Sequence, residues 1–159
     1  MKFIEFTSTM FYSGYFPVGP GTAGTLVAVG IYILEYIIFG EISWIINVVI
    51  VALLLYPSVK ICDRAEKFFG IKDPPQVVID ESLGYWIAVL CYPFNLKIVA
   101  IAFFIFRLFD ILKPYPIKKI QNLRGGLGIM VYDWLAGIYT NLMILLIIFI
   151  SGQINMPIY

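Results

Sequence analysis

The chain has 159 residues, enough for one domain. Hydrophobic residues make up 61% of it and charged residues only 13%, whereas a soluble domain is near half apolar and about a quarter charged. A soluble core of this size could not bury so much apolar surface, so the composition predicts one integral membrane domain over residues 1–159. The net charge of +1 does not indicate nucleic-acid binding, and the absence of histidine excludes histidine-based catalysis and most catalytic zinc sites.

Apolar runs along the chain predict the membrane crossings, since about 20 apolar residues cross a bilayer and fewer suffice where the ends are buried in protein. We expect five transmembrane helices, at residues 24–39, 42–59, about 80–92, 96–112 and 129–150. The connection Gly40-Glu41 and the turn Pro93-Phe94-Asn95 predict two tight hairpins. Segment 3–16 mixes aromatic residues with Thr and Ser, which predicts an interfacial or re-entrant helix. The expected fold is all-α, a compact bundle of about five transmembrane helices plus this N-terminal helix.

The distribution of basic residues predicts the orientation in the membrane. With the N-terminus in the cytoplasm, most basic residues fall on the inner side: Lys2, Lys60, Arg64, Lys67, Lys72, Lys113, Lys118, Lys119 and Arg124. Only Lys97 falls outside, and Arg107 lies within the fourth span. This asymmetry predicts a multi-pass protein of the cytoplasmic membrane with its C-terminus outside. Cys62 and Cys91 then lie at opposite ends of their spans, so we expect no shared disulfide or metal site.

Four clusters of polar and small residues fall at the predicted cytoplasmic helix ends. The first is PGTAGT at 20–25, where a helix start offers unpaired backbone N–H groups to a phosphate. Thr22, Gly24 and Thr25 are the candidate phosphate-binding residues of this cluster. Close helix packing through Gly21 and Gly24 is the alternative interpretation.

The second cluster is DPPQVVIDE at 73–81, which places carboxylates next to an apolar helix. Carboxylates are unfavourable in a membrane unless they cap a helix or bind a cation. Capping explains one acid better than two, so Asp73, Asp80 and Glu81 are candidate metal ligands, with capping as the alternative.

The third and fourth clusters lie on the predicted fourth and fifth spans. Arg107 and Asp110 are three residues apart on one helical face and are followed by Lys113-Pro114. An ionisable pair inside a membrane indicates function, with a structural salt bridge as the alternative. In the fourth cluster, Asp133, Gly137 and Asn141 recur at four-residue spacing, which predicts a polar and small stripe facing the bundle. A glycine loop with an ordinary helix cap would also account for it.

The convergence of these clusters on one membrane face predicts a phosphoryl site. Carboxylates without His or Cys favour Mg²⁺, and an Arg beside them suits bidentate phosphate contact. At a lipid interface, such a site indicates a phospholipid head group as substrate. We assign catalysis to Asp80, Glu81, Asp110 and Asp133, metal binding to Asp73, Asp80, Glu81 and Asp133, and phosphate binding to Thr22, Gly24, Thr25, Arg107 and Lys113.

Four motifs in order, PGTAGT, DPPQVVIDESLGYW, FRLFDILKPYPI and GGLGIMVYDWLAG, resemble the phosphatidylglycerophosphatase A family over about residues 20–137. The resemblance implies a Mg²⁺-dependent phosphatase of the bacterial inner membrane that converts phosphatidylglycerophosphate to phosphatidylglycerol. The family pattern has Asp-Asp where this chain has Tyr132-Asp133, which leaves Asp133 to carry the ligand role.

Two other classes of protein remain as alternatives. CDP-alcohol phosphatidyltransferases are also Mg²⁺-dependent, but they carry widely spaced aspartates on two neighbouring helices, a run that this chain lacks. An ion or lipid transporter should have polar groups through the full membrane thickness, whereas the predicted outer halves are almost entirely apolar, with Glu35 the main exception. With no histidine present, we expect attack by water activated by metal and a carboxylate. The oligomeric state stays open.

Overall fold

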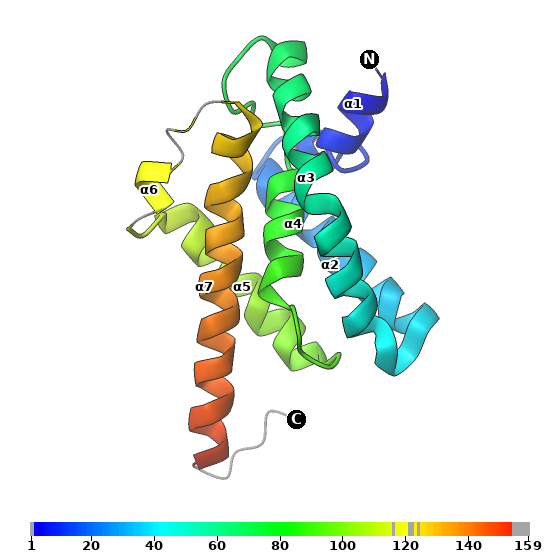
Figure 1. Cartoon of the computed structure of the whole chain (residues 1–159), viewed down its shortest axis with the longest axis vertical. Coiled ribbons are helices and arrows are strands. Elements are labelled where there is room, and N and C mark those ends of the chain that lie inside the picture. Colours follow the sequence, from blue (N-terminus) through cyan, green and yellow to red (C-terminus); the bar gives the residue numbers. More distant parts are fainter. Residues whose placement is uncertain (1, 116, 121–122, 124, 154–159) are drawn as a thin grey trace.

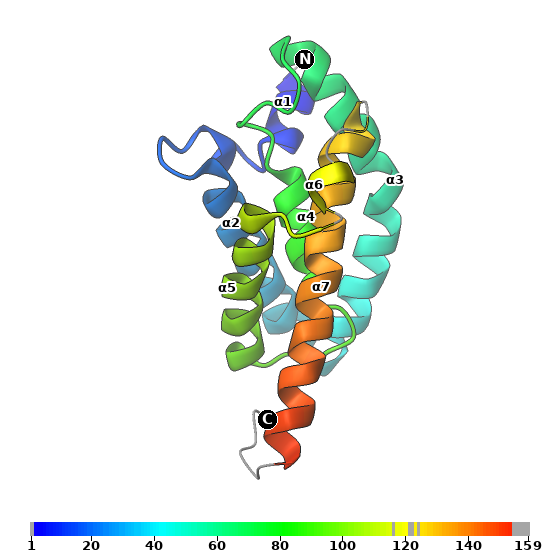
Figure 2. The same ribbon diagram turned by 90° about the vertical axis from the view of Figure 1, so that its left-hand side faces the viewer.

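The computed structural model describes residues 2–115, 117–120, 123 and 125–153, and within these residues all regular structure is helical. The α-helices are α1 (Lys2–Ser8), α2 (Pro20–Phe39), α3 (Ser43–Phe69), α4 (Ile79–Ala88), α5 (Leu96–Leu112), α6 (Ile117–Ile120) and α7 (Gly126–Gln153). Two short 3-10 helices, η1 (Ser13–Tyr15) and η2 (Gly40–Ile42), lie between them. The prediction of an all-α bundle is confirmed (Figures 1 and 2).

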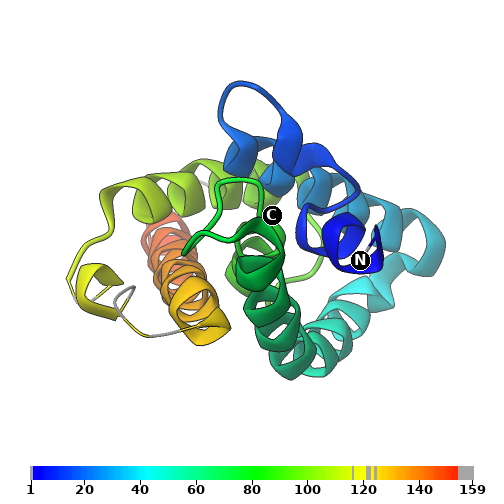
Figure 3. The same cartoon turned by 90° about the horizontal axis from the view of Figure 1, so that it is seen from above.

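Helix α4 lies at the centre of the bundle. It contacts α2, α3, α5 and α7, and eight of its ten residues are buried. Two glycines permit its close approach to α7: a Cβ on Gly84 would lie 2.8 Å from the Asp133 carbonyl oxygen, and a Cβ on Gly137 would overlap the Gly84 carbonyl oxygen. Viewed from above, α7 lies between α3 and α5 (Figure 3), both of which it contacts.

The expected number of membrane crossings is not confirmed. Helix α4 has ten residues, so at 1.5 Å per residue it is about 15 Å long, half of a hydrocarbon layer of about 30 Å. The predicted third span at 80–92 is therefore not a helix that crosses a membrane by itself. Among the described residues, two stretches are long and apolar enough to cross: Pro20–Phe69, which contains the α2–α3 hairpin, and Gly126–Gly152.

Helix α3 continues ten residues beyond its predicted end at 59, to Phe69. Its buried residues after Pro57 recur at helical spacing, at Ser58, Cys62 and Ala65, so the last turns still pack against the bundle. The basic residues of this stretch therefore lie on a helix rather than in a loop. Cys62 is buried and Cys91 is exposed, and both are free thiols.

The predicted tight hairpin at Gly40-Glu41 is confirmed, whereas the connection from α4 to α5 covers residues 89–95 and is longer than the predicted turn at 93–95. Helix α2 ends at Phe39 and α3 begins at Ser43, with only η2 between them. At the start of α5, the Lys97 amide donates a 2.8 Å hydrogen bond to the Asn95 side chain, which caps the helix. Segment 3–16 forms two short helices, α1 and η1, instead of one. The Val78 amide donates to the Ser8 carbonyl oxygen at 2.9 Å, so this N-terminal segment supports the chain that enters α4.

Candidate active site

Three carboxylates from two helices meet inside the bundle. Asp80 and Glu81 lie in the first turn of α4 and Asp133 lies near the start of α7. One oxygen atom from each lies within 4.8 Å of the others. Asp133 is 0% exposed and Asp80 is 1% exposed, while Glu81 is partly buried. We call these three residues the acidic cluster; three of the four predicted metal ligands belong to it.

Several oxygens of the acidic cluster have no hydrogen-bond donor. Within the described part of the chain, no donor contacts Asp80 Oδ1, Glu81 Oε2 or either carboxylate oxygen of Asp133. Capping does not account for the acids on α4, because the N-cap residue is Val78, no side chain caps the helix, and the Val78 amide donates to the Ser8 carbonyl oxygen instead. Buried carboxylates without partners are strongly unfavourable. These carboxylate oxygens are therefore suited to binding a positively charged ligand.

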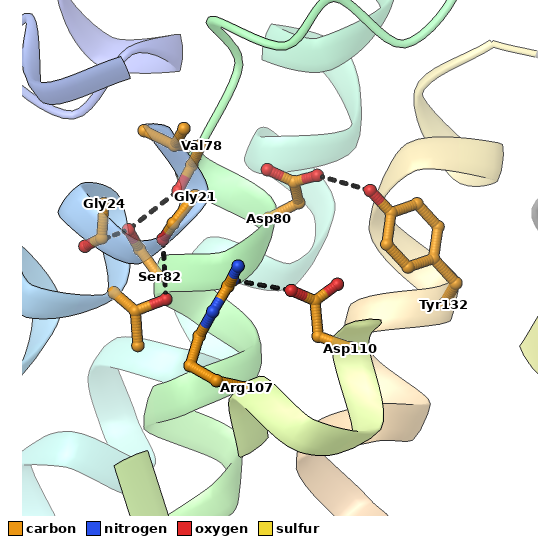
Figure 4. A network of polar contacts seen from close by, with 9 residues as sticks. Gly21, Gly24, Val78, Asp80, Ser82, Arg107, Asp110 and Tyr132 are labelled. Carbon is orange, nitrogen blue, oxygen red and sulfur yellow. Dashed lines mark hydrogen bonds and ion pairs between the residues drawn. The ribbon is translucent and has the colours of Figure 1, made fainter. Parts of the chain in front are cut away.

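Tyr132 joins the acidic cluster to the end of α5. Its hydroxyl donates a 3.2 Å hydrogen bond to Asp80 Oδ2 (Figure 4). Lys113, the C-cap residue of α5, places its Nζ 4.0 Å from the centre of the Tyr132 ring. Lys113 thus contacts the site through the Tyr132 ring.

Arg107 and Asp110 form the ion pair that their spacing predicted. Arg107 Nη1 lies 2.5 Å from Asp110 Oδ2, and Asp110 is buried. The Arg107 Nε atom has no acceptor among the described residues. Figure 4 shows the pair on α5 beside Asp80 and the start of α2. Arg107 therefore keeps hydrogen-bonding capacity beyond its ion pair.

The start of α2 touches the acidic cluster through Gly21. A Cβ on Gly21 would overlap Glu81 Oε1 and would lie 3.1 Å from Arg107 Nη1. Thr25 Oγ1 donates to the Gly21 carbonyl oxygen at 2.8 Å, so its hydroxyl makes a hydrogen bond within α2 rather than pointing to a phosphate site. A glycine at 21 thus permits the close approach of α2, the acidic cluster and the guanidinium.

The other predicted residues of this helix start lie elsewhere. Gly24 packs against Val78, where a Cβ would lie 2.6 Å from that side chain, which supports the packing interpretation at this position. Thr22 lines an apolar pocket of about 460 Å³ formed with residues such as Phe16 and Leu26. The structure therefore does not place Thr22 with Gly21 at the acidic cluster.

Asp73 lies outside the acidic cluster. It is exposed in the connection between α3 and α4, at a φ of 50°, and its amide donates to Glu66 Oε1 at 3.2 Å. Its metal-binding role stays a prediction.

Comparison with known proteins identifies the family. The family model described as phosphatidylglycerophosphatase A matches residues 6–148. The chain belongs to the phosphatidylglycerophosphatase A family.

Relatives of this phosphatidylglycerophosphatase A family member are bacterial. An Escherichia coli phosphatidylglycerophosphatase A is 36% identical over 130 residues, covering 80% of this chain and 73% of the relative. One from Haemophilus influenzae is 33% identical over 138 residues, covering 86% and 83%. A Bacteroides thetaiotaomicron protein, provisionally named a phosphatidylinositol-3-phosphatase, is 39% identical over 141 residues, covering 86% and 87%. No solved structure matches the chain.

Membership of this family makes the chain a membrane-associated phosphatase of phospholipid metabolism, and it disfavours the phosphatidyltransferase and transporter alternatives. Two residues of the site, Gly21 and Tyr132, were not among the predicted site residues. Gly21 lies within PGTAGT, but a glycine at a helix start also suits simple packing. Tyr132 directly precedes Asp133, yet nothing in the sequence pairs its hydroxyl with Asp80, which is about fifty residues away.

Proposed function

We propose that the protein is a Mg²⁺-dependent phosphatase that hydrolyses phosphatidylglycerophosphate to phosphatidylglycerol and phosphate at the cytoplasmic face of the bacterial inner membrane. The observation that carries the proposal is the acidic cluster, in which buried carboxylate oxygens from α4 and α7 lack hydrogen-bond donors. The position of Arg107 beside Gly21 and Glu81 supports a phosphate site next to it.

The donor set fits Mg²⁺ better than a softer metal ion. All three residues of the acidic cluster offer oxygen, which hard cations prefer. Asp80, Glu81 and Asp133 would hold the ion, which supplies positive charge to offset the negative charge of the phosphate. The same charge would compensate the buried carboxylates, whose unpaired burial is otherwise unfavourable.

Side chains of the protein bind the phosphate and transfer the proton during hydrolysis. Arg107 binds and orients the phosphate through its planar guanidinium, while the ion pair with Asp110 fixes the guanidinium. A carboxylate of the acidic cluster accepts the proton of the attacking water, since the chain has no histidine to do so. The water oxygen bonds to phosphorus and the ester P–O bond breaks. The glycerol oxygen leaves as an alcohol, protonated by the proton that the carboxylate had accepted from the water.

The choice of lipid rests on the names of the relatives. Two are phosphatidylglycerophosphatases A, and the third is provisionally named for phosphatidylinositol 3-phosphate. Both lipids carry a terminal phosphomonoester, so both present the dianion that Arg107 and a metal would bind. The family match favours phosphatidylglycerophosphate.

Phosphate release from a panel of lipids tests the proposal. Purified protein in mixed micelles receives phosphatidylglycerophosphate, phosphatidylinositol 3-phosphate, phosphatidic acid and water-soluble glycerol 3-phosphate, each with Mg²⁺ or with EDTA. We expect the highest kcat/KM for phosphatidylglycerophosphate, poor turnover of the soluble compound because acyl chains supply remote binding energy, and no activity in EDTA. Full activity in chelator would contradict the proposed Mg²⁺ requirement. A preference for phosphatidylinositol 3-phosphate would make that lipid the substrate in place of phosphatidylglycerophosphate.

Two exposed lysines test the membrane orientation, with the N-terminus in the cytoplasm and the C-terminus outside. Lys72 precedes α4 and Lys97 lies in the first turn of α5, so the proposed topology places them on opposite faces. In a background of Cys62→Ala and Cys91→Ser, an impermeant thiol reagent should label Lys97→Cys but not Lys72→Cys in intact cells. After membrane disruption both should react, and labelling of Lys72→Cys before disruption would contradict the orientation.

A further inference from the structure

We infer that Tyr132 is a positioning residue of the acidic cluster: its hydroxyl holds Asp80 by Oδ2 and keeps Oδ1 available to a bound divalent cation. The inference rests on the proposed metal site and concerns how this chain orients one of its ligands. Figure 4 shows Tyr132 facing Asp80 from α7 across to α4.

The hydrogen bond from Tyr132 makes the two carboxylate oxygens of Asp80 different from each other. Tyr132 donates to Oδ2 at 3.2 Å, whereas no donor in the described part of the chain contacts Oδ1. Asp80 is 1% exposed and Tyr132 is 5% exposed, so water does not compete freely for this hydrogen bond. A carboxylate held by one oxygen presents the other in a single direction, which is the usual effect of an outer hydrogen bond on a metal ligand.

The tyrosine ring is itself fixed from two sides. Its backbone belongs to α7, and Lys113 Nζ lies over the ring at 4.0 Å from its centre. Lys113 is positioned by the end of α5, where its amide donates to the Phe109 carbonyl oxygen at 2.9 Å. Three helices thus determine the direction of one hydroxyl, α7 through its backbone, α5 through the cation and α4 through Asp80.

The chain offers a matched control in Tyr85, which is also buried and whose hydroxyl also makes a 3.2 Å hydrogen bond, to the Val99 carbonyl oxygen. Tyr85→Phe and Tyr132→Phe therefore remove equivalent hydroxyls, one away from the carboxylates and one at Asp80. The experiment measures Mn²⁺ binding by electron paramagnetic resonance, the Mg²⁺ dependence of kcat, KM for the lipid, and the melting temperature of the purified protein.

We expect Tyr132→Phe to raise the Kd for Mn²⁺ about 10- to 100-fold, the range typical of a lost outer partner of a metal ligand. Saturating Mg²⁺ should restore most of kcat, and KM for the lipid should stay within about twofold because the phosphate contacts remain. Tyr85→Phe should lower the melting temperature at least as much and leave the Kd unchanged. An unchanged Kd in Tyr132→Phe would overturn the inference and leave the proposed function standing.

A double variant separates the inference from a general effect on folding. If Tyr132 acts through Asp80, Tyr132→Phe should change the Kd no further in an Asp80→Asn background. An additional tenfold loss there would contradict the inference. Wild-type protein that binds no Mn²⁺ and remains fully active in EDTA would instead refute the proposed metal site, and the inference with it.

Discussion

The two ends of the contact between α4 and α7 differ in whether their polar side chains have hydrogen-bond partners. At one end, Asn141 donates to the carbonyl oxygens of Ala88 at 3.1 Å and Leu90 at 2.9 Å, and Tyr92 donates to the Asn141 carbonyl oxygen at 2.8 Å. At the other end, Asp133 lies on the same face of α7, about two turns earlier, and neither of its carboxylate oxygens has a donor in the described part of the chain.

The proposed metal site accounts for this difference between a structural polar group and an acid at the site. Buried polar groups in folded proteins almost always have hydrogen-bond partners, so each exception calls for an explanation. Asn141 satisfies the open carbonyl groups where α4 ends, and its role is complete within the protein. Asp133 is fully buried, whereas Asn141 is only partly buried, yet Asp133 lacks such a partner. This is the state expected of a residue that completes its contacts with a cation.

Amide substitutions in the acidic cluster should have the largest effect. Asp80→Asn and Asp133→Asn keep the shape of the side chain but remove its charge, so each should lower kcat by about 10² to 10⁴. Without metal, their stability should match or exceed that of the wild type, because an unpaired buried charge is gone. Turnover and thermal melting in detergent with EDTA measure the two effects. Near-normal turnover in both variants would contradict the assignment of the acidic cluster to the active site.

Mg²⁺ should stabilise the protein only while the acidic cluster is intact. A ligand at 100 times its Kd adds about 2.7 kcal/mol to the free energy of unfolding. We expect Mg²⁺ to raise the melting temperature of the wild type and of Asn141→Leu, and to lose this effect in Asp133→Asn. Equal stabilisation of Asp133→Asn would show that the ion binds elsewhere.

Arg107→Lys should have an intermediate effect on activity. Lysine can keep an ion pair with Asp110, but it lacks the planar fork that contacts a phosphate through two N–H groups. Hydrogen bonds to charged groups contribute about 1.5–3 kcal/mol, so kcat/KM should fall about 10- to 100-fold. Lys60→Arg, an exposed change on α3, provides a control that should retain wild-type activity. A normal kcat/KM in Arg107→Lys would leave Arg107 a structural role only.

Asn141→Leu should lower stability and leave turnover nearly unchanged, the opposite of what we expect for the carboxylate variants. The carbonyl oxygens of Ala88 and Leu90 lose their donor, which should lower the free energy of unfolding by about 1–2 kcal/mol. Turnover per folded molecule should stay within about twofold of the wild type. A loss of turnover comparable to that of Asp133→Asn would remove the distinction between the two ends.

The smallest effect is expected for Asn47→Leu on α3. Asn47 donates to the Trp86 carbonyl oxygen at 3.2 Å, but its own Oδ1 is buried and has no donor among the described residues. The substitution removes one hydrogen bond together with one unsatisfied acceptor, so the free energy of unfolding should change by less than about 1 kcal/mol. A larger loss, measured beside Asn141→Leu, would show that Asn47 carries more of the packing against α4 than its contacts indicate.

The polar stripe on α7 was predictable from the sequence and is confirmed. Asp133 is buried, Gly137 packs against the Gly84 carbonyl oxygen, and Asn141 bonds to the end of α4. Helical periodicity suffices here, since residues four apart share a face whatever lies opposite. The pairing of Arg107 with Asp110 follows for the same reason, because both residues lie on one helix.

Which side of α2 faces the carboxylates was not predictable in this way. Periodicity relates Gly21 and Thr22 to each other but leaves the rotation of the helix about its axis open. That rotation is determined by packing between α2 and α4, where Gly24 meets Val78 and where Ser82 Oγ donates to the Gly24 carbonyl oxygen at 3.2 Å. Gly21 therefore lies against Glu81, while Thr22 faces the apolar pocket.

By itself, the sequence determined the class of this protein, its helical content, the tight hairpin between α2 and α3 and the candidate residues at one end of the predicted spans, because composition and local periodicity carry that information. The tertiary structure decided that α4 is a short helix inside the bundle and that Asp80, Glu81 and Asp133 share one site. A helix buried by other helices and a helix buried in lipid both require apolar side chains, so their sequences look alike. Only the packing of α4 against α2, α3, α5 and α7 distinguishes them, and the same packing brings its first turn to Asp133 and Tyr132.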